Sequence, residues 1–206
     1  MAKEKEEIDK LFFEKQALAD GHKLIAGMDE VGRGPLAGPV CTACVIMPLD
    51  DLIDGIDDSK KVPEKKREML AEKIKEKAIC YSVQMVDENK IDEINILQAT
   101  KLCMKKTLEN MRVMPDITLV DAIDKLDVKC EIKGIVKGDA LSYSIGCASI
   151  LAKVTRDKFM EKLDQEYPVY GFAKHKGYGT KAHIDAIKEY GPCEYHRISF
   201  LKFLEK

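Results

Sequence analysis

Apolar residues recur along this chain with two spacings, one typical of strands and one typical of helices. Predominantly apolar runs predict five strands, at residues 24–29, 39–47, 78–86, 117–120 and 130–136. Amphipathic stretches and capping signals predict helices at residues 4–19, 63–77, 92–111, 143–167 and 180–190, with a short last helix after His196. Strands come first as a group and then alternate with helices, which indicates an α/β fold with a mixed five-stranded sheet flanked by helices.

The composition is that of a globular chain. Hydrophobic residues make up 45% and charged residues 34% of the 206 residues, and neither an internal repeat nor a low-complexity linker is visible. One domain over residues 1–206 is therefore the simplest organisation. No apolar run approaches the roughly 20 residues of a membrane helix, and the N-terminus is highly charged. We therefore expect no membrane partner and a cytoplasmic location.

Charge is distributed unevenly, which matters more than the net charge of -2. Residues 129–206 contain 14 Lys and Arg against 10 Asp and Glu, so the remainder of the chain is acidic. A basic part beside an acidic part is compatible with a protein that contacts phosphates and also holds cations.

The seven cysteines are odd in number and scattered, which favours a reduced chain over a disulfide framework. Cys41 and Cys44 form a CxxC pair, but no second Cys or His pair follows at zinc-site spacing. Both cysteines fall within a predicted strand. Packing in the core is the favoured interpretation, because free cysteine behaves as a small hydrophobic residue.

Four acidic residues stand at or just after the ends of predicted strands: Asp29, Glu30, Asp121 and Asp139. Strand ends in open α/β sheets face a cleft in which ligands bind. If these strands are neighbours, the carboxylates converge and repel one another unless a cation lies between them. Oxygen-only ligands select Mg²⁺ or Mn²⁺, and two such ions about 3.5–4 Å apart can stabilise the attacking and leaving oxygens of a phosphodiester.

Each of these acids alone has a simpler explanation, as a turn residue or a helix cap. Four in this arrangement favour a metal site. Asp29 and Glu30 pose a difficulty, because neighbours in a regular strand point to opposite faces. They can share one site only if the strand ends or distorts there, which the following Gly32 and Gly34 permit.

The turn Gly32-Arg33-Gly34 and Tyr178 are candidates for contacting a ribose. Glycines let the backbone approach a substrate closely, and backbone groups can recognise a 2′-hydroxyl, which is both donor and acceptor. Tyr178 lies in a glycine-flanked loop, where its ring could stack on a sugar or a base. The alternatives are a plain tight turn and a tyrosine packed at the domain edge.

Other polar side chains could serve the same site or only the surface and the core. Candidate phosphate contacts, with a solvated surface charge as the alternative for each, are Lys60, Lys61, Lys153, Lys174, Lys176 and Arg197. Candidate general bases, which two metal ions would make unnecessary, are His175, His183 and His196. Residues without a catalytic-triad context, suited to helix capping or close packing, are Ser142, Ser144 and Ser149.

Several blocks, in order along nearly the whole chain, resemble the motifs of the ribonuclease HII family. The first block is IAGMDEVGRGPLAGP at residues 25–39. The others are DSKK (58–61), NIL (95–97), VDA (120–122), KGD (137–139), ASILAKVTRD (148–157), GYGT (177–180) and HR (196–197). The sister type HIII usually has Gly-Lys-Gly in the turn and an added N-terminal domain. Arg33 and the short stretch before the first strand therefore fit type HII better.

The resemblance implies a ribonuclease H-like fold with additional C-terminal helices. Residues 1–22 would be an N-terminal helical extension, and residues 168–206 a helical part that binds substrate. It implies that the metal-binding catalytic carboxylates are Asp29, Glu30, Asp121 and Asp139. It implies that the residues recognising the ribonucleotide at an RNA–DNA junction are Gly32, Arg33, Gly34 and Tyr178, and we predict further substrate contacts at Lys60, Lys61 and Lys153.

The implied activity is endonucleolytic cleavage on the 5′ side of a ribonucleotide, in RNA–DNA hybrids or embedded singly in duplex DNA. It would use two Mg²⁺ or Mn²⁺ ions and leave 3′-hydroxyl and 5′-phosphate ends, and the enzyme would be a monomer. Two alternatives are a non-catalytic module that binds hybrids and a different metal-dependent nuclease or phosphotransferase on the same fold. A pure binding module has no use for four repelling carboxylates, which argues against the first alternative.

Overall fold

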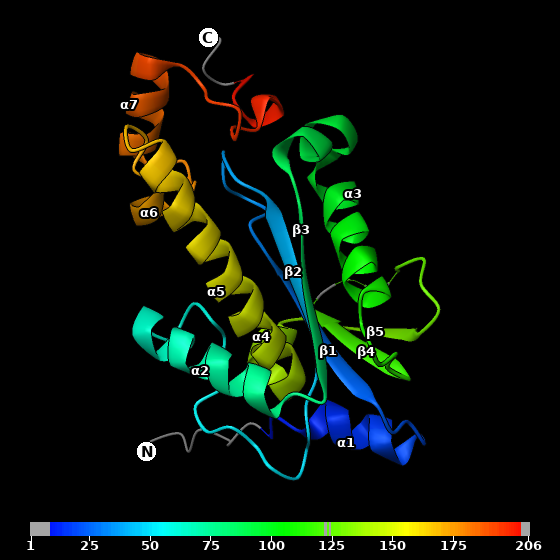
Figure 1. The fold of residues 1–206 in the computed structure, drawn as a ribbon. Helices are drawn as coiled ribbons and strands as arrows, with labels where there is room; N and C mark the ends of the chain where they lie inside the picture. The colour runs from blue at the N-terminus through cyan, green and yellow to red at the C-terminus, as the bar shows by residue number, and fades with distance from the viewer. Residues whose placement is uncertain (1–8, 122, 124, 203–206) are drawn as a thin grey trace, which may run out of the picture.

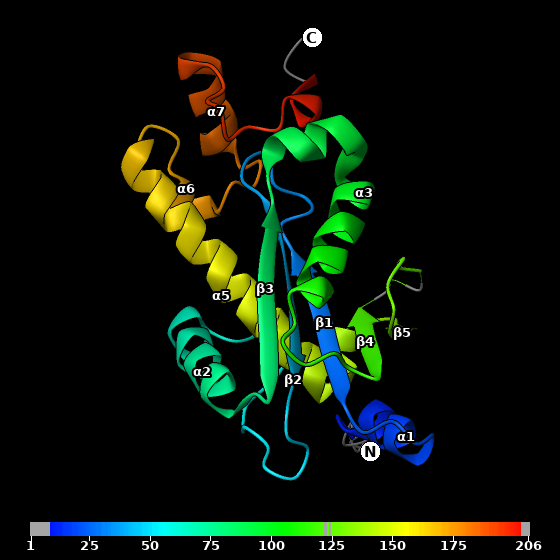
Figure 2. The same ribbon diagram turned by 45° about the vertical axis from the view of Figure 1, so that its right-hand side comes forward.

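The computed structural model describes residues 9–121, 123 and 125–202, and its centre is a five-stranded sheet with helices on both faces (Figures 1 and 2). The strand order is β3-β2-β1-β4-β5. β1 pairs antiparallel with β2, and β2 with β3, whereas β1, β4 and β5 run parallel. The strands are β1 (Ile25–Val31), β2 (Val40–Ile46), β3 (Cys80–Val86), β4 (Ile117–Asp121) and β5 (Glu131–Ile135). The prediction of a mixed five-stranded sheet flanked by helices is confirmed.

The helices form a layer on each side of the sheet (Figure 2). α3 (Glu88–Glu109) covers one face, and α5 (Tyr143–Glu166) covers the other together with α2 (Glu64–Lys77) and α1 (Phe12–Ala19). Alternate residues of β2 serve the two layers: Cys41 faces α5, and Cys44 faces α3. Both cysteines are buried and free, so the prediction that they pack in the core is confirmed.

The last part of the described chain lies against the C-terminal half of α5. It contains α6 (Phe172–His175), α7 (Lys181–Tyr190) and the 3₁₀ turn η1 (Ile198–Phe200). Phe172 and Ile187 pack with Met160 of α5 in a separate apolar cluster. A bridge between Ala37 and His196 ties this part to the β1–β2 connection. None of the helices described combines the length and apolar character needed to span a membrane.

Several predicted bounds were wrong. The first helix begins at Phe12 after a turn, not at residue 4, and residues 4–8 lie outside the described residues. α3 begins at Glu88, before the predicted 92, and Asn95 interrupts it with a φ of 65°. The Asn95 side chain accepts hydrogen bonds from two following backbone N–H groups, so it starts a second helical segment. α4 (Gly138–Leu141) and α6 were not predicted, and the last helix is a single 3₁₀ turn.

Candidate active site

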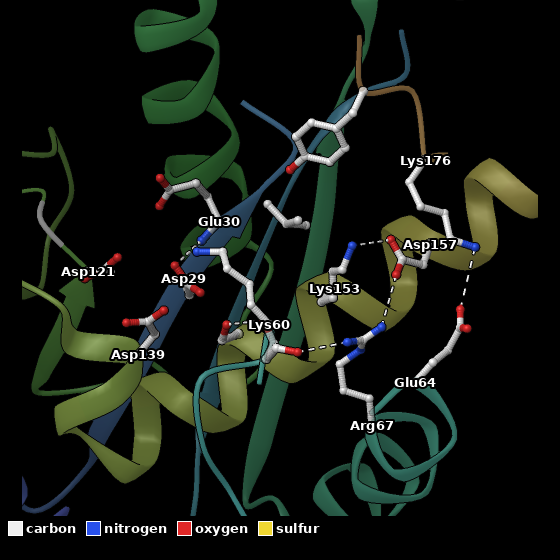
Figure 3. Close-up of a pocket in the computed structure, with 14 residues that line it drawn as sticks. Asp29, Glu30, Lys60, Glu64, Arg67, Asp121, Asp139, Lys153, Asp157 and Lys176 are labelled. Carbon is white, nitrogen blue, oxygen red and sulfur yellow. Dashed lines mark hydrogen bonds and ion pairs between the residues drawn. The ribbon is translucent and has the colours of Figure 1, made fainter. Parts of the chain in front are cut away.

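A cleft of about 500 Å³ opens where β1 and β4 end, between α5 and the loop before α2. Figure 3 shows that its two ends differ: four carboxylates gather at one end, with Lys60 nearby, and ion pairs of Arg67, Lys153 and Lys176 with Asp157 and Glu64 form the other. The acidic end is formed by Asp29, Glu30, Asp121 and Asp139. All four acids singled out in the sequence therefore line one cleft.

Parallel pairing of β1 with β4 makes Asp29 and Asp121 neighbours. Met28 pairs with Val120, so the next residue along each strand is one of these two aspartates. Met28 and Val120 pack in the cluster that includes α3. Because side chains alternate, Asp29 and Asp121 both belong to the opposite face, toward α5.

Glu30 enters the cleft for a different reason from the one predicted. β1 does not end or distort at Asp29 but continues to Val31, and Glu30 still pairs with Thr42 of β2. The strand that ends is β4, at Asp121. Since no β4 residue flanks Glu30, its side chain lines the same cleft although it starts from the other face of the sheet.

The turn after β5 brings Asp139 to Asp121. Lys137 adopts the left-handed region with a φ of 60°, which allows α4 to start immediately. The backbone N–H of Gly138 donates a 2.8 Å hydrogen bond to Oδ1 of Asp121. The first turn of α4 therefore fixes Asp121 and places Asp139 beside it.

Burial, with neighbouring negative charge, raises the pKa of three carboxylates in the cleft: Asp29, Glu30 and Asp139. Burial, followed by the charge of Glu30, raises the pKa of Asp29 well above its usual value, and the Ser149 hydroxyl opposes this. Burial raises the pKa of Glu30 despite the nearby Arg33. Burial, then Asp121, raises the pKa of Asp139. The folded protein thus gathers negative charge at a cost that a bound cation would remove.

The donor set suits a hard divalent cation. It consists of carboxylate oxygens, and Oε2 of Glu30 is buried without a hydrogen-bond partner among the described residues. In this arrangement, no three Asp, Glu, His or Cys side chains in the described ranges lie close enough together to ligate one ion.

The turn Gly32-Arg33-Gly34 borders the cleft beside Glu30. Gly32 has a φ of +93°, a conformation that favours glycine. Arg33 forms a 3.3 Å ion pair with Glu30 and keeps nearly half of its side chain exposed. A Cβ on Gly34 would lie 3.7 Å from the ring of Tyr178, which is 43% exposed and lines the cleft. Gly34 of the turn and the ring of Tyr178 therefore lie side by side at the edge of the cleft.

The predicted basic contacts divide into two groups. Lys60 and Lys153 line the cleft, and Lys176 joins them with a side chain that is 13% exposed. The interpretation of Lys176 as a solvated surface charge was wrong, because Lys176 forms ion pairs with Glu161 and Glu64. Lys61 and Lys174 are exposed outside the cleft lining.

Arg197 is not available to a phosphate. It is fully buried and donates hydrogen bonds to the backbone carbonyl groups of Gly32, Arg33 and Gly38. Arg156, also fully buried, does the same for Pro39 and Ala37. These two arginines hold the turn from behind, a role that the sequence did not indicate.

The histidine and serine candidates serve the structure around the cleft. His183 and His196 are buried and bond to each other, and none of the three histidines is part of the cleft lining. Ser142 caps α5 at Ile145, as predicted. Ser149 is different, because it lines the cleft: its hydroxyl bonds to Ser59 and lowers the pKa of Asp29 against the effect of burial.

Sequence reasoning missed the carboxylate of Asp157. It lies on α5 at the basic end of the cleft, where it bonds to Lys153 at 2.8 Å and Arg67 at 3.5 Å. The available signal was its position one helical turn after Lys153.

Comparison with known proteins identifies the family. The model of the family described as Ribonuclease HII matches residues 26–203. The chain belongs to the ribonuclease HII family. Ribonuclease HII of Caldicellulosiruptor saccharolyticus is 55% identical over 197 residues, which cover 95% of this chain and 96% of that protein. The family resemblance seen in the sequence is thereby confirmed.

Solved structures agree with this assignment. The ribonuclease H2 from Pyrococcus horikoshii superposes with a TM-score of 0.72 and 29% identity, covering 86% of this chain and 93% of that one. RNase HII in a PCNA:RNase HII complex from Archaeoglobus fulgidus gives a TM-score of 0.74 and 26% identity, covering 89% and 97%. The ribonuclease H-like fold is confirmed, and the protein is a metal-dependent endoribonuclease that acts on RNA–DNA hybrids.

Proposed function

We propose that this enzyme also cuts on the 5′ side of single ribonucleotides embedded in duplex DNA, leaving 3′-hydroxyl and 5′-phosphate ends. Two Mg²⁺ or Mn²⁺ ions would be held by Asp29, Glu30, Asp121 and Asp139. The observation that carries this proposal is the convergence of four carboxylates on a cleft whose other end is cationic. A nucleic acid strand needs both features, one for its reacting phosphate and one for the neighbouring phosphates.

Bound divalent ions would supply an activated water and stabilise the leaving oxygen. The protein contributes the placement of the ligands. Asp29 and Asp121 follow a paired position on adjacent strands, and Gly138 holds Asp121 through its backbone N–H. Glu30 and Asp139, which line the same cleft, would complete the ligand set.

We assign substrate recognition to the turn and to Tyr178. Gly34 is exposed and has no side chain, so a ribose can approach its backbone closely and the 2′-hydroxyl can be recognised there, whereas the buried Gly32 shapes the turn. Tyr178 faces Gly34, so its ring would meet the neighbouring nucleotide. Lys60, Lys61 and Lys153 would contact phosphates. Residues 168–206 would form the substrate-binding part of one domain, acting as a monomer.

A cleavage assay on matched duplexes tests the proposal. The set contains an all-DNA duplex, an RNA–DNA hybrid and a DNA duplex with one ribonucleotide, each with Mg²⁺ or Mn²⁺. We expect cleavage of the last two, with the product ending 5′ to the ribonucleotide, and none of the first. Tight binding without cleavage, or equal cleavage of all-DNA duplex, would contradict the proposal. Asp121→Asn is the control for the mechanism and should be inactive.

Gly34→Ala should weaken substrate binding without changing the stability of the fold. The added Cβ meets Tyr178 at an ordinary contact distance of 3.7 Å, so the melting temperature should change little. It occupies the space through which the backbone approaches the ribose, and we expect KM for the single-ribonucleotide duplex to rise roughly tenfold, the loss of about 1.4 kcal/mol of binding. Steady-state kinetics together with thermal unfolding measure both effects. An unchanged KM would remove Gly34 from the recognition surface.

A further inference from the structure

The loop that carries Tyr178 is held by consecutive carbonyl groups. The carbonyl of Lys176 accepts a 2.9 Å hydrogen bond from Arg156, and that of Gly177 accepts one of 2.8 Å from the backbone of Leu36. Both donors come from parts of the chain that also support the turn at residues 32–39. These hydrogen bonds therefore connect the loop before Tyr178 to the turn at residues 32–39.

The carbonyl of Tyr178 has a side-chain partner outside the cleft. It lies 2.9 Å from Nδ1 of His183 on α7, and it also accepts a hydrogen bond from the N–H of Thr180. Nε2 of His183 lies 3.1 Å from Nε2 of His196. The backbone N–H of Cys193 lies 2.9 Å from Nδ1 of His196. We call His183 and His196 the histidine chain.

The two ends of the histidine chain fix its tautomers. The N–H of Cys193 can only donate, so Nδ1 of His196 is unprotonated and the proton is on Nε2. That proton is donated to Nε2 of His183, whose own proton must then be on Nδ1. The carbonyl of Tyr178 can only accept, so it requires a proton at this nitrogen. Every ring nitrogen is used, and this proton arrangement satisfies the three contacts that link Cys193, His196, His183 and Tyr178. Nδ1 of His196 also lies 3.3 Å from the carbonyl of Cys193, a longer contact than the 2.9 Å to the N–H of Cys193.

Both rings are neutral at neutral pH. His183 is fully buried and His196 nearly so, and burial lowers the pKa of each to about 4. A second proton on either ring would place two N–H groups against each other. The histidine chain is therefore a fixed link between α7 and the carbonyl of Tyr178, and it does not donate a proton to the cleft.

We propose that His183 is a positioning residue for Tyr178, acting through the Tyr178 carbonyl with its tautomer set by His196. This rests on the proposed role of Tyr178 in contacting the substrate. The Nδ1–H of His183 fixes the peptide group from which the exposed ring projects toward Gly34. Losing that donor should loosen the ring, weaken substrate binding and leave the chemical step largely intact.

Two substitutions separate the contacts of His183. His183→Asn places an amide N–H near the position of Nδ1 and keeps the donor to Tyr178, but it loses His196. His183→Gln reaches the position of Nε2 and keeps His196, but it loses Tyr178. We expect KM on the single-ribonucleotide duplex to rise roughly fivefold in His183→Gln, the loss of about one hydrogen bond, and to stay near the wild-type value in His183→Asn, with kcat similar in both.

Combination with Tyr178→Ala shows whether the effect passes through the tyrosine. If it does, adding His183→Gln to Tyr178→Ala should change KM no further. Effects that multiply, or a normal KM in His183→Gln beside a raised KM in Tyr178→Ala, would overturn the proposal and leave the role of Tyr178 intact. An unchanged KM in Tyr178→Ala would instead remove the proposed role of Tyr178, and this inference with it.

Two measurements do not depend on the kinetics. In the unsubstituted enzyme, long-range ¹H–¹⁵N correlation should show His183 protonated at Nδ1 and His196 at Nε2, and the opposite tautomer at His183 would overturn the proposal. The chain contains no tryptophan, so Tyr178→Trp provides a single fluorescent reporter. Its anisotropy should fall when His183→Gln is added and stay unchanged with His183→Asn. Equal anisotropy in all three proteins would contradict a positioning role.

Discussion

Replacing Asp29 by asparagine will abolish cleavage and, in the absence of divalent ions, raise the stability of the protein. The amide keeps the shape of the side chain but removes a charge that is 6% exposed beside Glu30 and Asp121. Removing a proposed metal ligand should cost several kcal/mol of transition-state stabilisation, so kcat should fall by about 10³-fold or more. Relief of the repulsion should stabilise the metal-free fold by about 1–2 kcal/mol.

The sign of the pH dependence follows from the raised pKa of Asp29. The folded protein holds the proton more tightly than the unfolded chain, so this group contributes stability that is complete below its usual pKa of 3.8. That stability is lost as the pH rises through the higher pKa of the folded state. Metal-free stability should therefore gain more from Asp29→Asn at pH 7 than at pH 4. Added Mn²⁺ should stabilise the original enzyme and have less effect on the variant.

Thermal unfolding with and without chelator, at both pH values, measures these changes. Each kcal/mol should shift the melting temperature by about 2–4 °C for a chain of this size. Glu72→Gln is the matched control, because this exposed carboxylate is paired with Lys75, which lowers its pKa. Its removal should not stabilise the protein. An Asp29→Asn variant that cuts at the original rate, or that melts lower without metal at pH 7, would refute the assignment.

The strands and their terminal acids could be predicted because burial leaves a direct trace in the sequence. β2 is buried at every position and appears as a run that is apolar except at Thr42. Asp29 and Asp121 break such runs, and parallel neighbours end at the same edge of a sheet. Glu30 was harder, since its access to the cleft depends on where β4 stops. That is a property of the neighbouring strand, and it is invisible in the local pattern of β1.

Contacts between distant residues could not be predicted. Arg197 appeared as a cation free to meet phosphate, yet its partners lie 159 to 165 residues earlier in the chain. A charged side chain is usually exposed, and only the fold shows that unpaired carbonyl groups of a tight turn surround this one. Asn95 was hidden for another reason, because the helical segments on both sides of it continue one apolar pattern.

Gly27→Ala should be the most destabilising single-methyl substitution near the site. An added Cβ would lie 2.0 Å from the backbone carbon of Ser144 and 2.3 Å from the backbone nitrogen of Ile145. Neither atom can rotate away, so β1 and the start of α5 must separate. We expect a loss of about 3–5 kcal/mol, which lowers the melting temperature by roughly 6–20 °C. Asp29 lies two residues along the same face of β1, so cleavage should also fall.

Gly34→Ala is the control for this packing effect. Both substitutions add one methyl group, but only the methyl group at Gly27 would collide with backbone atoms.

A second-site test distinguishes backbone from side-chain crowding. The Ser144 hydroxyl is buried without a partner among the described residues, so Ser144→Ala should be mild on its own. Since the crowded atoms belong to the backbone, adding it to Gly27→Ala should not restore stability. Recovery in the double variant, measured by thermal unfolding, would show that α5 is held away from β1 by a side chain and that the close backbone contact does not define the position of Asp29.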